Sequence, residues 1–194
     1  MSIKISIKNS LNQKSIKNHV FFTNENFKIN ELSKLPISKF SNFINQSINS
    51  NELGDKNFLS LDINASQKVI LIKIKDSQSP FDIERIGAEF YVYLKLNLYL
   101  KTTFYEQNIR STFPKNKFFF DQFAHGLQLK SYEFNKYKSK SKEKKFDIEV
   151  FNKNKTFQFN RNKKYRSLIE GTNLTKDLVS EPGNILHPDE YAKR

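Results

Sequence analysis

Alternating apolar and polar residues along the chain predict several β-strands. Residues 2–8 read SIKISIK, with isoleucines on one face and lysines and serines on the other, as in a half-buried strand. Residues 68–75 read KVILIKIK, and their consecutive apolar residues predict a central strand that is covered on both faces. Shorter apolar runs predict further strands at 19–23, 57–63 and 146–151.

Apolar residues that recur every three or four positions predict helices between these strands. Such stripes occupy residues 38–48, 115–129 and 163–179. The expected buried positions are Phe40, Phe43, Ile44 and Ile48 in the first, Phe118, Phe119, Phe123 and Leu127 in the second, and Leu168, Ile169, Thr172 and Val179 in the third.

Residues 80–100 fit two patterns. Ser79-Pro80, followed by acidic residues, is typical of a helix start, and an apolar stripe with helical spacing follows it. From Phe90 to Leu100, however, apolar residues also alternate as in a strand. We expect a helix to about Asn97 and a strand from about Thr102. The helical stripe consists of Ile83, Ile86, Phe90 and Leu94.

Strands that alternate with helices predict an α/β fold with a mixed sheet between helices, followed by a linker helix. The 194 residues suit one domain with an appendage, and the 14% aromatic content argues against intrinsic disorder. The absence of cysteine excludes disulfides, thiolate metal sites and a catalytic thiol. Because residues 1–20 hold no apolar core of a signal peptide and no run suits a bilayer, we expect a soluble, cytoplasmic protein with no membrane partner.

The net charge of +13 raises the alternative of a stand-alone basic binding module for nucleic acid or a nucleotide. The lysines are spread over every segment. Arginine, whose guanidinium can bind a phosphate through two hydrogen bonds at once, is scarce. Lysine, asparagine, isoleucine and phenylalanine all have AT-rich codons, so compositional drift explains the charge better than a selected patch. We expect the basic run 136–145 to be a solvated loop.

No catalytic or metal-binding pattern stands out in the sequence. The three histidines, His19, His125 and His187, form no metal-binding pair, and we expect packing or surface roles for them. The five glycines are too dispersed for a phosphate loop. The acidic residues Asp82 and Glu84 suit a helix start, and 147–149 suits the exposed face of a strand.

Two segments resemble the leucyl aminopeptidase family. Residues 124–140, AHGLQLKSYEFNKYKSK, resemble a family segment in which Ala-x-Gly precedes an apolar pair and an aromatic-rich stretch. Residues 174–194, LTKDLVSEPGNILHPDEYAKR, resemble the loop that opens the family's catalytic domain, although Ser180 and Gly183 replace the usual Asn and Pro. The matching positions are Ala124, Gly126, Leu127, Tyr132, Phe134, Tyr137, Lys138, Leu178, Val179, Pro182, Asn184, Leu186 and Pro188.

This resemblance implies a division of the chain into three parts. Residues 1–155 would form an amino-terminal, macrodomain-like α/β domain, 156–181 a connecting segment and helix, and 182–194 the truncated start of the catalytic domain. Because the helix that opens at Pro188 has so few residues to pack on, we expect this tail to be the least well anchored part.

The resemblance also implies a function for a longer parent enzyme. The family uses two divalent metals, manganese or zinc, to remove amino-terminal residues from peptides, and it typically forms hexamers. Its metal-binding strings, Asn-Thr-Asp-Ala-Glu-Gly-Arg and the preceding Lys-Gly-x-x-Phe-Asp-Ser-Gly-Gly, do not occur here. We therefore assign no catalytic residue, metal ligand or cofactor to this chain, and expect it to be inactive without the missing catalytic domain.

Overall fold

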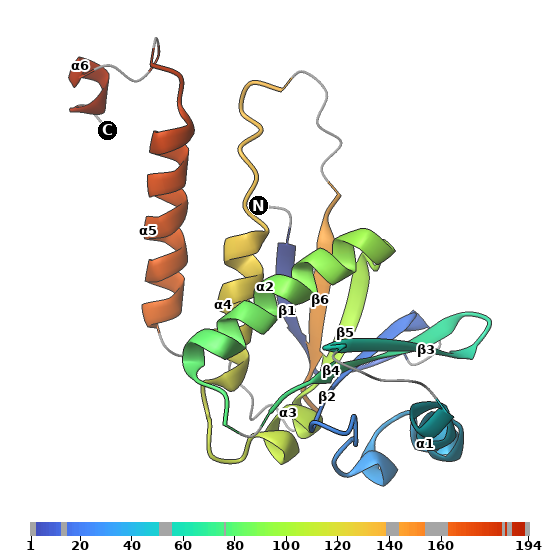
Figure 1. The fold of residues 1–194 in the computed structure, drawn as a ribbon. Helices are drawn as coiled ribbons and strands as arrows, with labels where there is room; N and C mark the ends of the chain where they lie inside the picture. Colours follow the sequence, from blue (N-terminus) through green and yellow to red (C-terminus); the bar gives the residue numbers. More distant parts are fainter. Residues whose placement is uncertain are drawn as a thin grey trace.

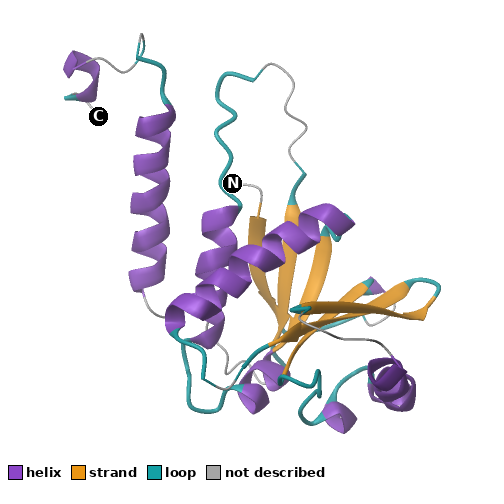
Figure 2. Cartoon of the chain, viewed as in Figure 1, coloured by secondary structure: helices purple, strands orange, loops and turns teal. Residues whose placement is uncertain are grey.

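The computed structural model of the chain describes residues 3–12, 15–50, 56–75, 77–138, 144–153, 163–183, 185 and 188–192. A six-stranded sheet lies at its centre, with helices on both faces (Figures 1 and 2). The strands are β1 (Ile3–Lys8), β2 (Asn18–Thr23), β3 (Phe58–Asn64), β4 (Gln67–Lys73), β5 (Lys101–Tyr105) and β6 (Phe146–Phe151).

The sheet is mixed and its strand order is β1-β6-β5-β2-β4-β3. The first five strands in this order run parallel, and β3 closes one edge antiparallel to β4 through a hairpin. The strand β1 pairs with β6, so that Ile3 lies opposite Phe146. The predicted α/β class is confirmed, and β4 is covered on both faces as expected, because residues 69–72 are fully buried.

One face of the sheet is covered by α2 (Pro80–Asn97) and α4 (Phe119–Lys130), which cross each other (Figure 1). Alternate strand residues such as Val20 and Phe22 point to this side and pack against Phe90 and Phe123 from the two helices. The ring of Phe22 meets the Phe123 ring edge-on, with 5.1 Å between centroids. This cluster is the larger part of the hydrophobic core.

The other face is covered by α1 (Ser41–Ser50), by the short 3-10 helices η2 (Leu32–Lys34) and η3 (Ser38–Phe40), and by the segment before them. Phe21, Leu71 and Tyr105 point from the strands to this side, where they pack with Phe27 and Ile44. The chain thus forms a three-layered α/β/α arrangement.

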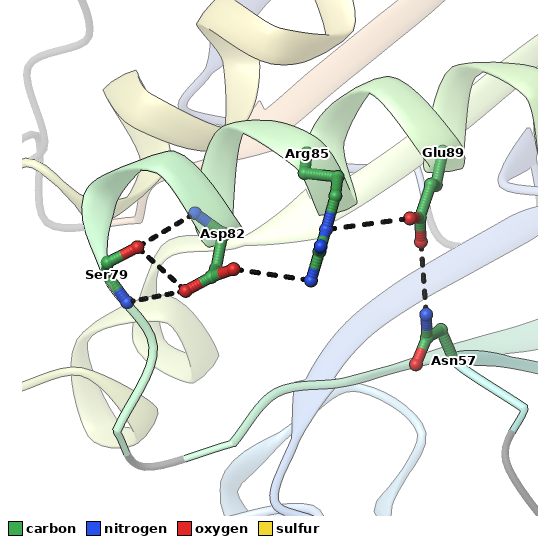
Figure 3. Close-up of polar contacts among 5 residues, drawn as sticks. All are labelled: Asn57, Ser79, Asp82, Arg85 and Glu89. Carbon is green, nitrogen blue, oxygen red and sulfur yellow. Dashed lines mark hydrogen bonds and ion pairs between the residues drawn. The ribbon is translucent and has the colours of Figure 1, made fainter.

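The helix start predicted before residue 83 is confirmed in atomic detail (Figure 3). Ser79 Oγ accepts a hydrogen bond from the Asp82 backbone N–H at 3.2 Å, and the Ser79 backbone N–H donates to the Asp82 carboxylate at 3.1 Å. The Ser79 hydroxyl also donates to the Asp82 carboxylate at 2.7 Å, and this bond, together with the one from the Ser79 backbone N–H, lowers the pKa of Asp82. Further along α2, Glu89 accepts from Asn57 Nδ2 at 3.0 Å, which ties the helix to the start of β3.

The ambiguous segment resolves as a helix to Asn97 followed by β5. The expected stripe Ile83, Ile86, Phe90 and Leu94 is buried. The competing strand pattern fails because its members Val92, Leu96, Leu98 and Leu100 are exposed. Leu98, which follows the last helical residue, has a left-handed backbone conformation with φ of 57°.

Some sequence expectations need correction. Residues 106–112 form a helix, α3 (Glu106–Thr112), that the sequence did not predict, because its seven residues follow β5 directly and carry little apolar pattern. The helix expected at 115–129 begins at Phe119, so that Phe118 precedes it and is exposed. Phe43 on α1 is also exposed, because α1 turns Ile44 and Ile48 toward the core instead.

The remaining helices are α5 (Lys163–Ser180) and α6 (Pro188–Tyr191). Helix α5 runs beside α4, away from the sheet (Figure 1). Within the described part of the chain, no helix combines the length and the apolar character that crossing a membrane requires.

Candidate interdomain site

Two glycines set the distance between α2 and α4. A Cβ atom on Gly126 would lie 1.8 Å from the backbone oxygen of Glu84, and one on Gly87 would lie 2.0 Å from the backbone oxygen of Phe123. Contacts this short are forbidden to real side chains, so each helix places a glycine where the backbone of the other approaches. The family-motif residues Ala124 and Leu127 flank this crossing and are both 1% exposed.

His125, between Ala124 and Gly126, points from α4 toward α5. Its Nδ1 lies 3.3 Å from the Glu84 carboxylate, and its ring lies 5.3 Å from the ring of Tyr165 on α5. The histidine is 8% exposed. The expected packing role of His125 is therefore what the structure shows, with the added detail that it packs at the junction of α2, α4 and α5.

The segment after α4 holds the carboxyl-terminal half of α5 through four side chains, which we call the α5 clasp: Tyr132, Tyr137, Asp177 and Glu181. The Tyr132 hydroxyl donates to Asp177 Oδ1 at 2.7 Å. The Tyr137 hydroxyl donates to the Glu181 carboxylate, which also pairs with Lys136. The side chain of Glu181 is only 2% exposed, whereas Lys136 and Tyr137 are about half exposed.

A lysine of α5 strengthens the same attachment. Lys176 Nζ donates to the backbone oxygen of Leu129 at 3.0 Å and lies 5.1 Å above the ring of Tyr132. It therefore satisfies a carbonyl at the carboxyl end of α4 and makes a cation–π contact. The Lys95–Glu133 ion pair, at 2.7 Å, fixes the same segment to the end of α2.

The electrostatics of the clasp keep both phenols protonated. The hydrogen bond to Glu181 raises the pKa of Tyr137. Burial, together with the hydrogen bond to Asp177, raises the pKa of Tyr132. Both hydroxyls thus remain donors at neutral pH, as the two carboxylates require. The Lys95 ammonium lowers the pKa of Glu133, so that this carboxylate stays charged.

The contacts of the clasp bear on two sequence expectations. The basic run 136–145 is exposed as expected where the structure describes it, at residues 136–138, 144 and 145, although Lys136 and Tyr137 also contact Glu181. Residues 139–143 lie outside the described residues. On α5 the expected buried stripe is confirmed at Ile169, which is 6% exposed, and is wrong at Leu168 and Val179, which are 43% and 81% exposed. Helix α5 turns Ile169 and its polar clasp residues toward α4, since that face is the one in contact.

The other family-motif residues belong neither to the crossing of α2 and α4 nor to the clasp. The ring of Phe134 lies 5.8 Å from that of Tyr137, and Lys138 is exposed at the end of the same segment. Leu178 is partly exposed on α5, Pro182 follows that helix, and Pro188 begins α6 as predicted. Asn184, Leu186 and His187 lie outside the described residues.

Asp177 and Glu181 are functional residues that the sequence reasoning missed. They stand four residues apart, one in the last turn of α5 and one directly after it, and this helical spacing is a usable signal. Their tyrosine partners stand about 45 residues earlier, however, and no helical or strand period connects positions that far apart.

The described residues do not form a metal centre. Among them, no group of three or more His, Asp or Glu side chains converges in a way that could hold an ion. The contacts described above join the segment after α4 to the carboxyl end of α5. The two-metal chemistry that the resemblance implies does not fit the residues that this part of the protein supplies.

Comparison with known sequences supports the resemblance drawn from the two motifs. No family model matches the chain. A probable cytosol aminopeptidase from Rhodopseudomonas palustris (strain BisA53) is 32% identical over 75 residues, which are 37% of this chain and 15% of that protein. One from Phytoplasma mali (strain AT) is 37% identical over 78 residues, which are 37% of this chain and 16% of that protein.

Comparison with solved structures supports the fold. A mutant of tomato leucine aminopeptidase superposes on 98% of this chain with a TM-score of 0.67 and 19% identity, and the match covers 41% of that chain. A cytosol aminopeptidase from Coxiella burnetii matches 99% of this chain and 36% of its own, with a TM-score of 0.56 and 12% identity. These comparisons confirm the resemblance to the amino-terminal domain of the leucyl aminopeptidase family. The chain spans well under half the length of these solved relatives.

Proposed function

We propose that this chain is the amino-terminal, non-catalytic portion of a leucyl aminopeptidase. The observation that carries the proposal is the local sequence identity of 32% and 37% to two probable cytosol aminopeptidases. The fold and the position of α5 are consistent with it, because the superposition on the tomato enzyme extends over 98% of this chain. The role of the described part would be to position a catalytic domain attached beyond α5.

The α5 clasp gives this role a physical basis. Most of the stability of a helix in a protein comes from tertiary packing, so the 18 residues of α5 need contacts to hold one direction. Tyr132 and Tyr137 supply those contacts in the half of α5 nearest to α6. The clasp would therefore orient a catalytic domain that begins at residue 182 relative to the α/β domain.

The proposal also covers the chemistry, domain division and assembly of the longer parent enzyme. In it, two divalent metals, manganese or zinc, would polarise the peptide carbonyl and activate water, with ligands supplied by the catalytic domain. We divide the present chain into an α/β domain to residue 155, a connecting segment and helix at 156–181, and a start of that catalytic domain at 182–194. The parent would act on peptides in the cytoplasm as a hexamer.

An activity measurement on the purified chain tests the proposal. We expect no release of chromophore from a leucyl p-nitroanilide substrate in the presence of manganese or zinc, because the described residues form no metal centre. Metal-dependent release by this chain alone would contradict the proposed non-catalytic role.

Reading the gene beyond codon 194 tests the identity of the parent. An open frame that continues into the two metal-binding strings of the family would support it. A stop codon at that point would overturn the assignment to a longer enzyme and would favour a separate binding module.

A further inference from the structure

The strand β1 leaves one edge of the sheet open. It lies first in the strand order and pairs only with β6. Within the described part of the chain, no other element packs extensively along it. Exposure rises toward its carboxyl end, because Ile3 is buried, Ile5 is half-buried and Ile7 is 37% exposed. An edge strand of this kind presents unpaired backbone groups with which a further strand can pair.

The backbone of β1 has donors and acceptors that point away from β6. The Asn152 N–H donates to the Lys8 backbone oxygen at 2.9 Å, so the backbone of Lys8 faces β6. In a parallel pair, alternate residues of a strand bond to the neighbouring strand. The N–H and C=O groups of Ile5 and Ile7 therefore point outward, in the direction that an added strand would take. Such a strand could exchange hydrogen bonds with both residues, as in recognition by β-strand addition.

The side chains of β1 limit which strand can pair there. Ile5 lies on the face of α2 and α4, where it packs at the margin of the core. Lys4, Ser6 and Lys8 lie on the opposite face, because successive side chains of a strand alternate. Both lysines are exposed, and neither forms an ion pair with a described residue. The open edge thus carries positive and polar side chains on one face and apolar side chains on the other.

The neighbouring strands show which charge suits this edge. Lys4 lies opposite Asp147 of β6, and Asp147 lies opposite Lys101 of β5. Lys101 also pairs with Glu149 of β6 at 3.2 Å. The charges in this row alternate from strand to strand, and oppositely charged cross-strand pairs stabilise a sheet. An acidic residue on the outer side of Lys4 would continue the alternation.

A second copy of β1 does not meet this requirement. Two antiparallel copies centred on Ser6 would place Lys4 of each opposite Lys8 of the other, and like charges directly opposite each other destabilise a sheet. Edge strands commonly use lysine to prevent such self-pairing. The net charge of +13 adds a general repulsion between copies. The lysines therefore select against a second copy and for an acidic strand.

We propose that the open edge of β1 binds an extended acidic peptide by β-strand addition. The acidic residues of the peptide would stand four positions apart, opposite Lys4 and Lys8. Between them, two apolar residues would lie beside Ile5 and Ile7, and a small polar residue would lie opposite Ser6. This pattern reads the same in both directions, so it fits a parallel or an antiparallel strand. The interaction goes beyond the proposed role in an aminopeptidase and needs no peptidase chemistry.

Isothermal titration calorimetry of the unchanged chain with the acetylated peptide amide Asp-Val-Thr-Val-Glu tests the proposal. We expect a Kd of about 1 mM or lower. The peptide Val-Asp-Thr-Glu-Val has the same composition and charge, but its acidic residues stand two positions apart, so we expect it to bind about tenfold more weakly. Absence of heat from the first peptide up to about 5 mM would overturn the proposal. Equal affinity for both peptides would also overturn it, because charge attraction would then act without strand pairing.

Amide hydrogen exchange locates the bound peptide. With the peptide at about ten times its Kd, exchange at Ile5 and Ile7 should become about tenfold slower, because their N–H groups gain acceptors. Exchange in β3, which forms the other edge of the sheet, should be unchanged. Unchanged exchange at the two isoleucines, or equal protection of β3, would contradict binding at β1.

Charge reversal tests the role of the two lysines. In the double variant Lys4→Glu/Lys8→Glu, we expect the acidic peptide to bind about tenfold more weakly and the peptide Lys-Val-Thr-Val-Lys to bind in its place. Both side chains are exposed, so the fold should be intact, which far-ultraviolet circular dichroism verifies. If the double variant did not gain affinity for the basic peptide, the proposed pairing of charges would be wrong.

Lys75→Glu is the matched control for the charge reversal. Lys75 is an exposed lysine that follows β4, and the strands β6, β5 and β2 lie between β4 and β1. This variant should bind the acidic peptide as the unchanged chain does, and an equal loss of affinity would contradict a site at β1. Dimerisation of the unchanged chain that the peptide reverses would identify a second copy as the occupant and would overturn the proposal.

Discussion

The glycines at 87 and 126 show how one residue can determine the geometry of a helix pair. In sequence they looked like dispersed glycines that form no phosphate loop, and this is all that a single chain reveals of them. Their necessity comes from the backbone of a helix about forty residues away. The Ala-x-Gly of the family motif, which could be recognised but not explained from sequence, is therefore a packing motif.

Substitution of Gly126 by alanine should destabilise the chain strongly. The added methyl would lie 1.8 Å from the Glu84 backbone oxygen, and a backbone atom cannot move aside without separating α2 from α4. We expect a loss of about 3 kcal/mol or more in the free energy of unfolding, measured by urea denaturation.

Gly171→Ala is the matched control for that change. Gly171 lies within α5, and a Cβ there would meet nothing within 4 Å. Alanine should therefore stabilise the chain by about 0.5–1 kcal/mol, through helix propensity. Equal destabilisation by the two substitutions would show that the close approach of α2 and α4 is not what requires Gly126.

His19 should make the stability of the fold depend on pH. Burial lowers its pKa from 6.5 to about 4, so the unfolded chain binds the proton more readily than the folded chain. The stabilising effect of keeping the imidazole neutral is complete above about pH 6.5 and is lost as the pH falls toward 4. At pH 5 the loss from this group is about 2 kcal/mol.

Urea denaturation of the unchanged chain and of His19→Gln, each at pH 7 and pH 5, measures this effect. The unchanged chain should lose about 2 kcal/mol more than the variant between the two values. Carboxylates titrate equally in both proteins, so the difference isolates the histidine. Parallel losses in the two proteins would contradict a depressed pKa at His19.

At the scale of elements, α2 was predictable because its start and its stripe agree. Ser79, Pro80 and Asp82 occupy their preferred positions in the first turn, and the apolar residues keep the helical period. Helix α3 was not predictable, because its seven residues follow β5 directly and hold too little apolar pattern to distinguish them from a loop. Helix α5 was placed correctly, but its buried face only in part: Ile169 is buried as expected, whereas Leu168 and Val179 are exposed and polar clasp residues make further contacts.

Removal of the cap should weaken α2 by a measurable amount. Ser79→Ala deletes the oxygen that accepts from the Asp82 N–H, and we expect a loss of about 1 kcal/mol in thermal or urea unfolding. Arg85→Ala removes two ion pairs of the next turn, to Asp82 and Glu89 (Figure 3). Because Arg85 is exposed, that control should change stability by less than about 0.5 kcal/mol. A larger loss of stability in Arg85→Ala than in Ser79→Ala would show that the ion pairs, rather than the Ser79 cap, stabilise the start of α2.

At the scale of the whole molecule, sequence predicted the class of the fold but not its connections. The strand β1 pairs with β6, which lies about 140 residues later in the chain. The strand β2 lies between β5 and β4 and does not pair with β3, the next strand in the chain. Periodicity reports which face of a strand is buried, not which strand lies beside it. The same limit concealed the open edge of the sheet, because alternation alone does not show that β1 has a neighbour on one side only.

The α5 clasp fixes the direction in which the chain leaves the α/β domain, so weakening it should loosen α5 without unfolding the sheet. Glu181→Gln removes the charge that pairs with Lys136, in a side chain that is 2% exposed. We expect amide hydrogen exchange in the carboxyl-terminal turns of α5 to become about tenfold faster, while exchange in β2 and β4 is unchanged. Glu170→Gln, on the same helix but 63% exposed, should leave exchange as it is. If the two variants exchanged alike, α5 would be held by its contacts with α4 alone, and a clasp that orients a further domain would have no support.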